Sequence, residues 1–305
     1  MAHHRFTPTT YHRTIGSHEP VLTIESGDQV STTTVDAGGS DATGERITEG
    51  GNPQTGPFYV KGAEPGDTLA VRLDRLTANR PFGYTADRIS PLVLDPGYQP
   101  GIIGDRAYLR WAIDIANGVA RPEDPELAAL ELPLGPHLGC FGVAPDRGQA
   151  ISTATSGSHG GNMDYNKLLE GVTVYFPVFV PGALLHVGDG HALQGDGEIL
   201  GTGVEISFDV TVTVSVVKQT GQKWPRAQDD QFLMAIGCAR PLDQCMEHAT
   251  TEMIGWLMAE FCLSERQAHI LIGESVVYDL GNMFDPAYTM VCKVRRSLVE
   301  RLAGR

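Results

Sequence analysis

Residues 204–217 read VEISFDVTVTVSVV, and this stretch decides the fold class. Apolar side chains occupy every second position from Val204 to Val216, while Glu, Ser, Asp and Thr fill most of the positions between them. Successive side chains of a strand point to opposite faces, so this alternation predicts a long strand with one buried face and one polar face. Such a strand is typical of an antiparallel sheet that covers a core on one side.

Shorter segments of the same character lie in the N-terminal quarter of the chain. Residues 21–25 and 30–35 are rich in apolar side chains and are separated by the turn residues Ser26-Gly27-Asp28. Residues 61–67 (KGAEPGD) form another turn signal, and residues 68–76 then alternate again. Alternating segments that are punctuated by turn residues predict antiparallel strands.

Two segments depart from this pattern. Residues 78–110 are rich in Pro and Gly and are predicted to form a long loop with little regular structure, of the kind that commonly serves a site. Residues 171–180 form an apolar run with aromatic side chains, interrupted by Pro177. Proline has no N–H to donate to a neighbouring strand, so this run is predicted to be an edge strand or a bulged strand.

The C-terminal part of the chain changes to a helical pattern. From Leu242 to Phe261, apolar residues recur at spacings of three and four, which predicts an amphipathic helix whose Met and aromatic stripe lies in the core. Ser264 and Gln267 match a capping box and predict a second, short helix. A final strand is expected near residues 289–294.

These segments together predict a mainly β fold. We expect an antiparallel sandwich or barrel-like core with a small helical element near the C-terminus, at about residues 242–275. The sequence has no internal repeat, low-complexity tract or convincing linker, so residues 1–305 are predicted to form a single domain.

The charge and the cysteine content narrow the function classes. Lys plus Arg number 23 against 37 Asp plus Glu, a formal charge of −14 without a basic patch, so nucleic-acid binding is not expected. The five cysteines include no CxxC pair, which favours a reducing compartment. The N-terminus lacks the apolar segment of a signal peptide, and no stretch approaches the roughly 18 apolar residues of a membrane span. The sequence thus predicts a soluble, cytoplasmic protein with no membrane partner.

Residues that commonly do chemistry concentrate in three glycine-rich segments: 137–145 (HLGCFGVAP), 159–164 (HGGNMD) and 188–198 (GDGHALQGDGE). Asp189 and His191 are two positions apart, so in an extended chain both side chains point to the same side. A carboxylate and an imidazole that converge make half of a mixed nitrogen and oxygen metal site. The further candidate ligands within the same forty residues are His159, Asp164 and Glu198.

Each segment also has a simpler interpretation. GDG is common turn chemistry, and Asn162 and Asp164 could cap a helix that starts near Tyr165. Cys140, with His137 nearby, is conceivable as a thiolate nucleophile, but a small buried cysteine is the commoner explanation. The sequence contains no GxSxG elbow, P-loop or GxGxxG between a strand and a helix, so a serine nucleophile of that type and nucleotide-phosphate binding have no support.

The same segments resemble the acetamidase/formamidase family of small-amide hydrolases. Further blocks extend the resemblance over nearly the whole chain: 52–57 (NPQTGP), 60–67 (VKGAEPGD), 176–198 (FPVFVPGALLHVGDGHALQGDGE), 224–226 (WPR) and 234–237 (MAIG). The GDGHxxQGDGE string is long and unusual enough to be highly specific. The resemblance implies a largely β fold and a bound metal. It also implies hydrolysis of a linear carboxamide to a carboxylate and ammonia, with cyclic amides such as γ-lactams as the alternative.

The resemblance carries functional residues onto the positions that match its motifs. These are Asp36, Glu64, His137, His159, Asp164, Asp189, His191, Gln194 and Glu198. Three positions depart from the family pattern. Cys140 stands where an aliphatic residue is expected, His186 precedes GDGH where a small residue is usual, and Ser156-Gly157-Ser158 replaces a Pro-Arg pair before HGGNMD. These departures leave the preferred amide open.

Amide hydrolysis needs an activated water, a stabilised carbonyl oxygen and a proton for the leaving nitrogen. We expect a divalent metal, zinc first and calcium as the alternative, with ligands from Asp36, His159, Asp164, Asp189 and His191. The catalytic candidates are Glu64, His137 and Glu198, and the candidates for substrate or oxyanion contacts are Gly160, Gly161, Asn162 and Gln194. Which carboxylate binds the metal and which one moves the proton stays open.

Two other function classes stay open beside the metal-dependent amidase. One is a metal-independent amide hydrolase that uses Cys140 with a Glu. The other is a non-catalytic β-sandwich binding protein whose Asp-rich loops hold a structural Ca²⁺. The expected partners are a small amide and a further copy of the chain, because the apolar C-terminal stripe and the sheet edges favour a homo-oligomer, a dimer first.

Overall fold

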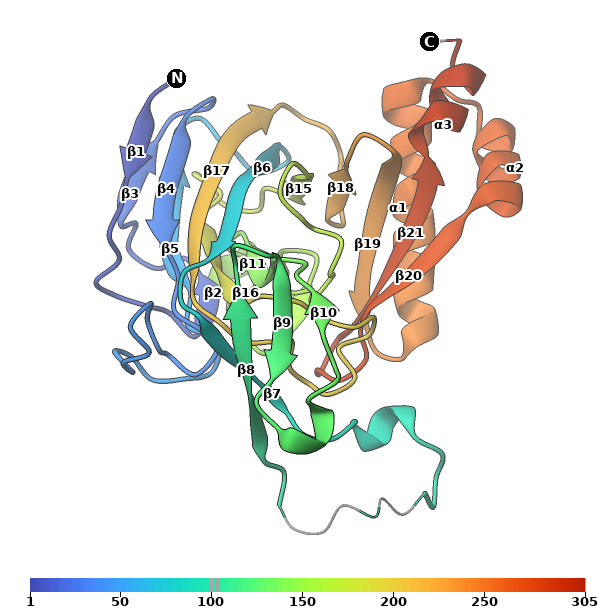
Figure 1. The fold of residues 1–305 in the computed structure, drawn as a ribbon. Coiled ribbons are helices and arrows are strands. Elements are labelled where there is room, and N and C mark those ends of the chain that lie inside the picture. The colour runs from blue at the N-terminus through green and yellow to red at the C-terminus, as the bar shows by residue number, and fades with distance from the viewer. Residues whose placement is uncertain (99–100, 102–104, 305) are drawn as a thin grey trace.

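The computed structural model describes residues 1–98, 101 and 105–304, and it shows a mainly β fold with helices at the C-terminal end (Figure 1). Over these residues the strands form sheets of nine, six, four and two strands. The predicted fold class is confirmed. That the chain forms a single domain stays a prediction.

The largest sheet is antiparallel except for the pairing of its first two strands. Its strands are, in order, β1 (His3–Arg5), β4 (Gln29–Thr33), β17 (Phe208–Val217), β6 (Thr68–Ala78), β15 (Thr173–Pro177), β18 (Arg226–Gln228), β19 (Phe232–Ala239), β21 (Tyr288–Arg295) and β20 (Val277–Asn282). The predicted final strand near 289–294 is therefore present as β21.

Strand β17 confirms the alternation that predicted the fold class. The side chains at even positions from 208 to 214 are buried, and those at odd positions from 209 to 215 are half-buried. The strand pairs antiparallel with β4 on one side and with β6 on the other. It begins at Phe208, so residues 204–207, the first four of the alternating stretch, lie outside the strand.

The six-stranded sheet brings the glycine-rich segments together. Its strands are, in order, β13 (Ser156–Gly157), β14 (Gly160–Asn162), β11 (His137–Gly142), β16 (Leu185–His191), β5 (Thr55–Val60) and β3 (Leu22–Ile24). Every residue of β11, β14 and β16 is buried. Residues as far apart in the sequence as His137 and His191 thus become direct neighbours.

The smaller sheets correct the expectation of a long loop over residues 78–110. The four-stranded sheet consists of β10 (Leu132–Pro133), β9 (Val119–Pro122), β8 (Tyr108–Asp114) and β7 (Phe82–Ala86), and the two-stranded one of β12 (Ala150–Ser152) and β2 (Thr14–Gly16). Both ends of the expected loop are strands, because β7 pairs with β8 across a long connection that contains η1 (Pro91–Val93), and Tyr84 of β7 packs edge-to-face against Tyr108 of β8. Two further 3₁₀ turns are η2 (Pro125–Leu127) and η3 (Asp146–Gly148).

The prediction of an edge or bulged strand at 171–180 is wrong, although the strand itself is present. Strand β15 pairs with β6 on one side and with β18 on the other, and neither register shifts. Pro177 is the last residue of β15, where its missing N–H removes no bond from the middle of the ladder. Its position within the strand, which the sequence alone does not reveal, is what makes the proline acceptable.

Three helices cover one end of the large sheet (Figure 1). They are α1 (Leu242–Phe261), α2 (Glu265–Ser275) and α3 (Arg296–Leu302). The predicted bounds of α1 and the capping box of Ser264 with Gln267 are confirmed. Met253, Trp256 and Leu257 of α1 pack with β19 and β21 into a second core, so the apolar stripe is structural. No helix within the described ranges is long and apolar enough to span a membrane.

Candidate metal centre

Strand β16 and the loop after it gather acidic side chains around one imidazole. Asp189 and His191 lie at the end of β16, and Glu198 and Glu205 follow before β17 begins. Asp189 and Glu198 adopt left-handed backbone conformations, with φ of 58° and 47°. Non-glycine residues seldom do so, and such strain is concentrated at functional sites.

Strand β11 leaves room for this group at Gly139. A Cβ atom at that position would lie 2.5 Å from Asp164 Oδ1, 2.7 Å from Asp189 Oδ2 and 2.7 Å from His191 Cε1. Atoms do not pack that closely, so a residue without a side chain is required for the three side chains to converge. The 137–145 segment therefore contributes space to the site as well as side chains.

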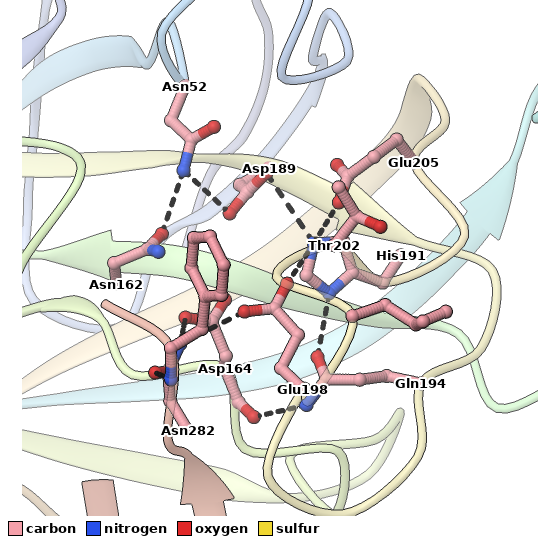
Figure 2. Close-up of polar contacts among 12 residues, drawn as sticks. Asn52, Asn162, Asp164, Asp189, His191, Gln194, Glu198, Thr202, Glu205 and Asn282 are labelled. Carbon is pink, nitrogen blue, oxygen red and sulfur yellow. Dashed lines mark hydrogen bonds and ion pairs between the residues drawn. The ribbon is translucent and has the colours of Figure 1, made fainter. Parts of the chain in front are cut away.

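His191 lies at the centre of the acidic group. Its Nε2 atom is 3.1 Å from Glu205 Oε1, 3.5 Å from Asp189 Oδ1 and 3.9 Å from Glu198 Oε1 (Figure 2). All four side chains are almost completely buried. The imidazole therefore offers one nitrogen to a space that carboxylate oxygens surround.

The orientation of the His191 ring is set by Gln194. The Gln194 Nε2 group donates to the carbonyl oxygens of Asp164 and Gly281, so its Oε1 atom faces the imidazole. The Nδ1–H of His191 donates to that Oε1 atom over 2.9 Å. In the neutral ring the lone pair is consequently on Nε2, which is how metal-binding histidines are commonly held.

Asparagine side chains hold the outer oxygens of the carboxylates (Figure 2). Asn282 Nδ2 donates to Asp164 Oδ2 over 2.7 Å and to Glu198 Oε2 over 2.9 Å. Asn52 Nδ2 donates to Asp189 Oδ2 over 3.1 Å. Each carboxylate is thereby fixed from behind while its other oxygen points inward.

The inward-facing atoms have no hydrogen-bond partner among the described residues, although they are buried. They are Asp164 Oδ1, Asp189 Oδ1, His191 Nε2 and Glu205 Oε2. Leaving a buried polar atom unpaired costs roughly 1–3 kcal/mol, and more for a charged group. Four such atoms on side chains that gather around His191 indicate a site that is built for a ligand with positive charge.

Burial also makes the negative charges of this group costly. In the described residues, the ion pairs of Asp189, Glu198 and Glu205 are all made with His191. Burial raises the pKa of Asp164 well above its ordinary value and that of Glu205 to about 7. Burial opposes the charge of His191 as well, but Glu205 and Asp189 outweigh it and raise its pKa. The group holds more acid than base, and protons or a cation must make up the difference.

Two overlapping sets of side chains could hold a metal ion. One set is Asp189, His191 and Glu205, and the other is Asp164, His191 and Glu198. The ligand atoms of each set lie within 4.8 Å of one another. Imidazole nitrogen with carboxylate oxygen is a donor set that divalent cations accept. The unpaired inward atoms and the surplus of negative charge both fit such an ion.

A cavity of about 410 Å³ opens directly onto this group. Asp189, Glu198 and Glu205 form part of its wall, and the other polar side chains along it are Arg46, Asn52, Tyr84, Tyr108, Asn162, Thr202 and Asp285. Burial raises the pKa of Asp285 to about 6. A small polar molecule in this cavity would contact the acidic group directly.

Comparison with solved structures decides the family. An acetamidase from Yersinia enterocolitica matches this chain with a TM-score of 0.85 and 32% identity, over 97% of this chain and 93% of that one. The chain belongs to the acetamidase/formamidase family. The sequence model of the Acetamidase/Formamidase family matches residues 147–278, which include the 159–164 and 188–198 segments.

Other members of the acetamidase/formamidase family agree with this assignment. An acetamidase structure from Bacillus halodurans matches with a TM-score of 0.82 and 29% identity, over 98% of this chain and 99% of that one. A formamidase from Methylophilus methylotrophus is 29% identical over 214 residues, which are 56% of this chain and 53% of that protein. The chain spans about half the length of the curated relatives it matches.

The structure brings together four of the residues that the sequence singled out. Asp164, Asp189, His191 and Glu198 meet at the centre of the site. Gln194 lies behind them and orients His191 instead of lining the cavity. The two-residue spacing of Asp189 and His191 was therefore a useful signal, and the interpretation of GDG as an ordinary turn does not account for their convergence.

Two predicted metal ligands lie outside both sets. Asp36 is buried in an ion pair with Arg80, 2.5 Å between Oδ2 and Nη2, and its Oδ1 atom accepts from the Ser40 N–H. Both of its oxygens already have partners, and Asp36 belongs to neither set of side chains that could hold a metal. His159 is buried beside Gly157 and Gly161, and burial lowers its pKa to about 4.

Two predicted catalytic residues, Glu64 and His137, belong to neither set of side chains that could hold a metal. Glu64 is exposed in the turn before β6, next to Asp67, which bonds to Lys218 beyond the end of β17. Glu205 lies just before the start of β17, at the opposite end of the strand from Lys218 and Glu64. The ten residues of β17 span about 33 Å, so Glu64 is remote from the site. His137 packs edge-to-face against His191, with 5.1 Å between ring centroids, and contacts Gln194.

Of the residues predicted to contact the substrate or the oxyanion, some line the cavity and others do not. Gly160 and Gly161 are paired with β13 on one side and with β11 on the other, next to the edge of the sheet, and do not line the cavity. Asn162 does line it, and its side chain contacts Asn52 and Asp285. The glycines thus serve close strand packing, since a Cβ at Gly160 would lie 2.7 Å from Phe141 O.

Several residues of the site are not evident from the sequence alone. Glu205 was assigned to the polar face of a strand, although the chain turns into the site there. Asn282 and Asp285 carried no motif that could have revealed them. Asn52 opened the NPQTGP block that resembles the family, so a signal for it existed.

Cys140 has no environment that would make it a nucleophile. The side chain is completely buried in β11, and burial, followed by Asp189 and Asp164, raises the pKa of its thiol well above the ordinary value. A nucleophilic cysteine needs the opposite, a lowered pKa and access. We expect Cys140→Ala to keep turnover within about tenfold of the parent, which is roughly 1.4 kcal/mol in the barrier. Iodoacetamide at neutral pH is expected to leave activity unchanged even though the exposed Cys262 reacts.

Proposed function

We propose that this chain hydrolyses the carbon–nitrogen bond of a short carboxamide, giving a carboxylate and ammonia, with the help of a divalent metal. One observation carries the proposal: Asp189, His191 and Glu205 offer ligand atoms within 4.8 Å of one another, each has a buried atom without a hydrogen-bond partner among the described residues, and both carboxylates line the cavity. Membership of the acetamidase/formamidase family supports the choice of substrate. A linear amide is preferred over a cyclic one on the names of the relatives alone.

We assign the metal to Asp189, His191 and Glu205, and we favour zinc. Zinc accepts imidazole nitrogen together with carboxylate oxygen and needs only three protein ligands at a catalytic site. Calcium prefers six to eight oxygen ligands, so the central imidazole counts against it. The bond from Gln194 to His191 Nδ1 keeps the Nε2 lone pair available for the ion.

The reaction also needs a group that moves a proton. When bound, a divalent cation supplies Lewis acidity toward the amide carbonyl and toward water. Glu198 lines the cavity, its Oε2 atom is held by Asn282, and its Oε1 atom lies 3.9 Å from His191 Nε2. Burial raises its pKa well above the ordinary value, which suits a carboxylate that takes a proton from water and delivers it to the leaving nitrogen.

The negative charge of the cavity suits both the binding of the amide substrate and the release of the carboxylate product. An amide NH₂ group has two hydrogens to donate, and Glu198 and Asp285 are acceptors on the cavity wall. After hydrolysis, a negative cavity repels the carboxylate product and so favours its release. We therefore expect a neutral substrate rather than an anionic one.

The test is amide turnover before and after the metal is removed. Purified protein is assayed for ammonia release from formamide, acetamide and propionamide, and for ring opening of a γ-lactam, while its metal content is measured. We expect turnover of at least one linear amide, loss of turnover after chelation, and recovery on adding zinc. The recovery distinguishes loss of the ion from unfolding.

Two outcomes would replace this proposal with another. Full turnover in metal-free protein, together with inactivation by a thiol reagent, would favour the Cys140 hydrolase. No turnover of any amide, with a melting temperature that rises on adding calcium, would favour the binding protein with a structural ion. Both measurements use the same preparations.

We also propose a cytoplasmic location and a homo-oligomer, a dimer first. The five cysteines are free in the structure, which supports a reducing compartment. Exposed apolar side chains on the C-terminal helices, Ile270 and Leu302 among them, support contact with a second copy. The mass of the protein in solution tests the oligomer.

A further inference from the structure

Neighbouring strands place a row of side chains in register beside the cavity. His191 pairs with Glu205, and Glu205 pairs with Tyr84, in two antiparallel bridges. The Glu205 N–H donates to Tyr84 O over 2.9 Å, and the Tyr84 N–H donates to Glu205 O over 3.3 Å. Directly opposed residues have Cβ atoms about 4.5–5.5 Å apart on the same face. Tyr84 is therefore the immediate neighbour of Glu205 on the face that carries His191.

The hydroxyl group of Tyr84 lies at the wall of the cavity. Tyr84 lines the cavity together with Asp189, Glu205 and Gly38. A Cβ at Gly38 would lie 3.1 Å from the Tyr84 hydroxyl oxygen, so the glycine leaves room for this group. The ring is held edge-to-face against Tyr108, with 5.3 Å between centroids. Among the described residues, the hydroxyl has no hydrogen-bond partner, so its proton is available to a bound molecule.

The side-chain amides along the same wall are already committed. Asn52 Nδ2 donates to Asn162 Oδ1 and to Asp189 Oδ2. Asn162 Nδ2 donates to Asp285 Oδ2. The cavity wall also carries Arg46, Thr202 and Tyr108, and its other polar groups are carboxylates, which accept hydrogen bonds and repel an anion. Tyr84 is paired directly with the proposed ligand Glu205, so its hydroxyl offers a neutral donor to a developing oxyanion beside the proposed metal ligands.

We propose that Tyr84 is a catalytic residue whose hydroxyl donates a hydrogen bond to the amide carbonyl oxygen as that oxygen becomes anionic. This inference rests on the amide hydrolysis proposed above. A phenol keeps its proton at neutral pH, so the donor stays neutral among carboxylates that would bind a cationic one. A hydrogen bond to an anionic oxygen is about twice as strong as one to a neutral carbonyl. The contact therefore strengthens in the transition state and accelerates the reaction.

The test is Tyr84→Phe, which removes one oxygen atom and keeps the ring packed against Tyr108. We expect kcat to fall on the order of 100-fold, as for other lost oxyanion donors, while KM changes by less than about threefold. Metal content and melting temperature are expected to equal those of the parent. Tyr59→Phe, on β5 and outside the cavity lining, is the matched control and is expected to keep parental kcat.

Each other outcome overturns the inference. A Tyr84→Phe enzyme with kcat within about threefold of the parent would show that the hydroxyl is not used. A variant that loses its metal would show that Tyr84 holds the site together and does not act on the substrate. If the parent itself turns over no amide, the proposed function fails and the role of Tyr84 fails with it. An active parent with an equally active Tyr84→Phe variant overturns only the role of Tyr84.

Discussion

Asp189→Asn is expected to lower kcat/KM for the best amide on the order of 1000-fold, about 4 kcal/mol in the barrier, and to remove most of the bound metal. Asn keeps the shape of Asp but discards its charge. The inward Oδ1 atom, 3.5 Å from His191 Nε2, would no longer carry the negative charge that attracts a divalent cation. Metal content by mass spectrometry and ammonia release are measured on the same protein.

Two further variants separate charge from ligand geometry. Excess metal is expected to restore Asp189→Asn in part, because an amide oxygen can still contact the ion. It is not expected to restore His191→Ala, which lacks the ligand atom. Asp196→Asn changes an exposed carboxylate in the same glycine-rich segment, one that contacts Asn166 and Lys167, and should behave as the parent. If the Asp189 variant keeps full metal and near-parental turnover, residues 188–198 are an ordinary turn and our assignment of the metal site is wrong.

Glu198→Gln is expected to lower kcat by two to four orders of magnitude while the protein keeps its metal. Glutamine retains the side-chain length and can keep a hydrogen bond with Asn282, but it cannot take a proton from water. Because Glu198 lies 3.9 Å from His191 Nε2 and is not assigned as a ligand, its loss should spare the ion. A variant that loses metal and activity together would make Glu198 a ligand instead of a proton carrier.

The pH dependence gives a second measure of the same role. A carboxylate acts as a base only when it is deprotonated, so kcat/KM of the parent should fall as the pH is lowered through the pKa of Glu198. Burial raises that pKa, which moves the fall toward neutral pH from the ordinary range near 4.5. Glu64→Gln serves as the comparison, because Glu64 lies in an exposed turn and its variant should keep parental kcat and the parental pH profile.

The secondary structure was predictable where the signal repeats within a short segment. The two-residue alternation over 208–217 and the three- and four-residue spacing over 242–261 arise from the geometry of a strand and a helix. Both periods are properties of local backbone, and each predicted element is present. Pro177 and residues 78–110 were misjudged because their meaning depends on partners: a place at the end of β15, and the pairing of β7 with β8.

Part of the site was also local. The sequence by itself determined that Asp189 and His191 are two positions apart, the spacing at which the side chains of an extended segment share one side, and the family motifs pointed to Asp164 and Glu198. Those residues meet because β11 and β16 are neighbours and because Gly139 leaves space between them. A spacing of two positions could predict the first pair, whereas the convergence of all four needed the sheet.

Only the tertiary structure decided the remaining roles. Glu205 has the sequence context of a solvent-facing strand residue, yet its pairing with Tyr84 and His191 directs it into the cavity. Asp36 has the context of a free carboxylate, yet Arg80, 44 positions away, neutralises it. Secondary structure follows from interactions between near neighbours in the chain. Whether a charged side chain is a ligand, an ion-pair partner or a surface group depends on which remote segment packs against it, and local sequence carries no record of that.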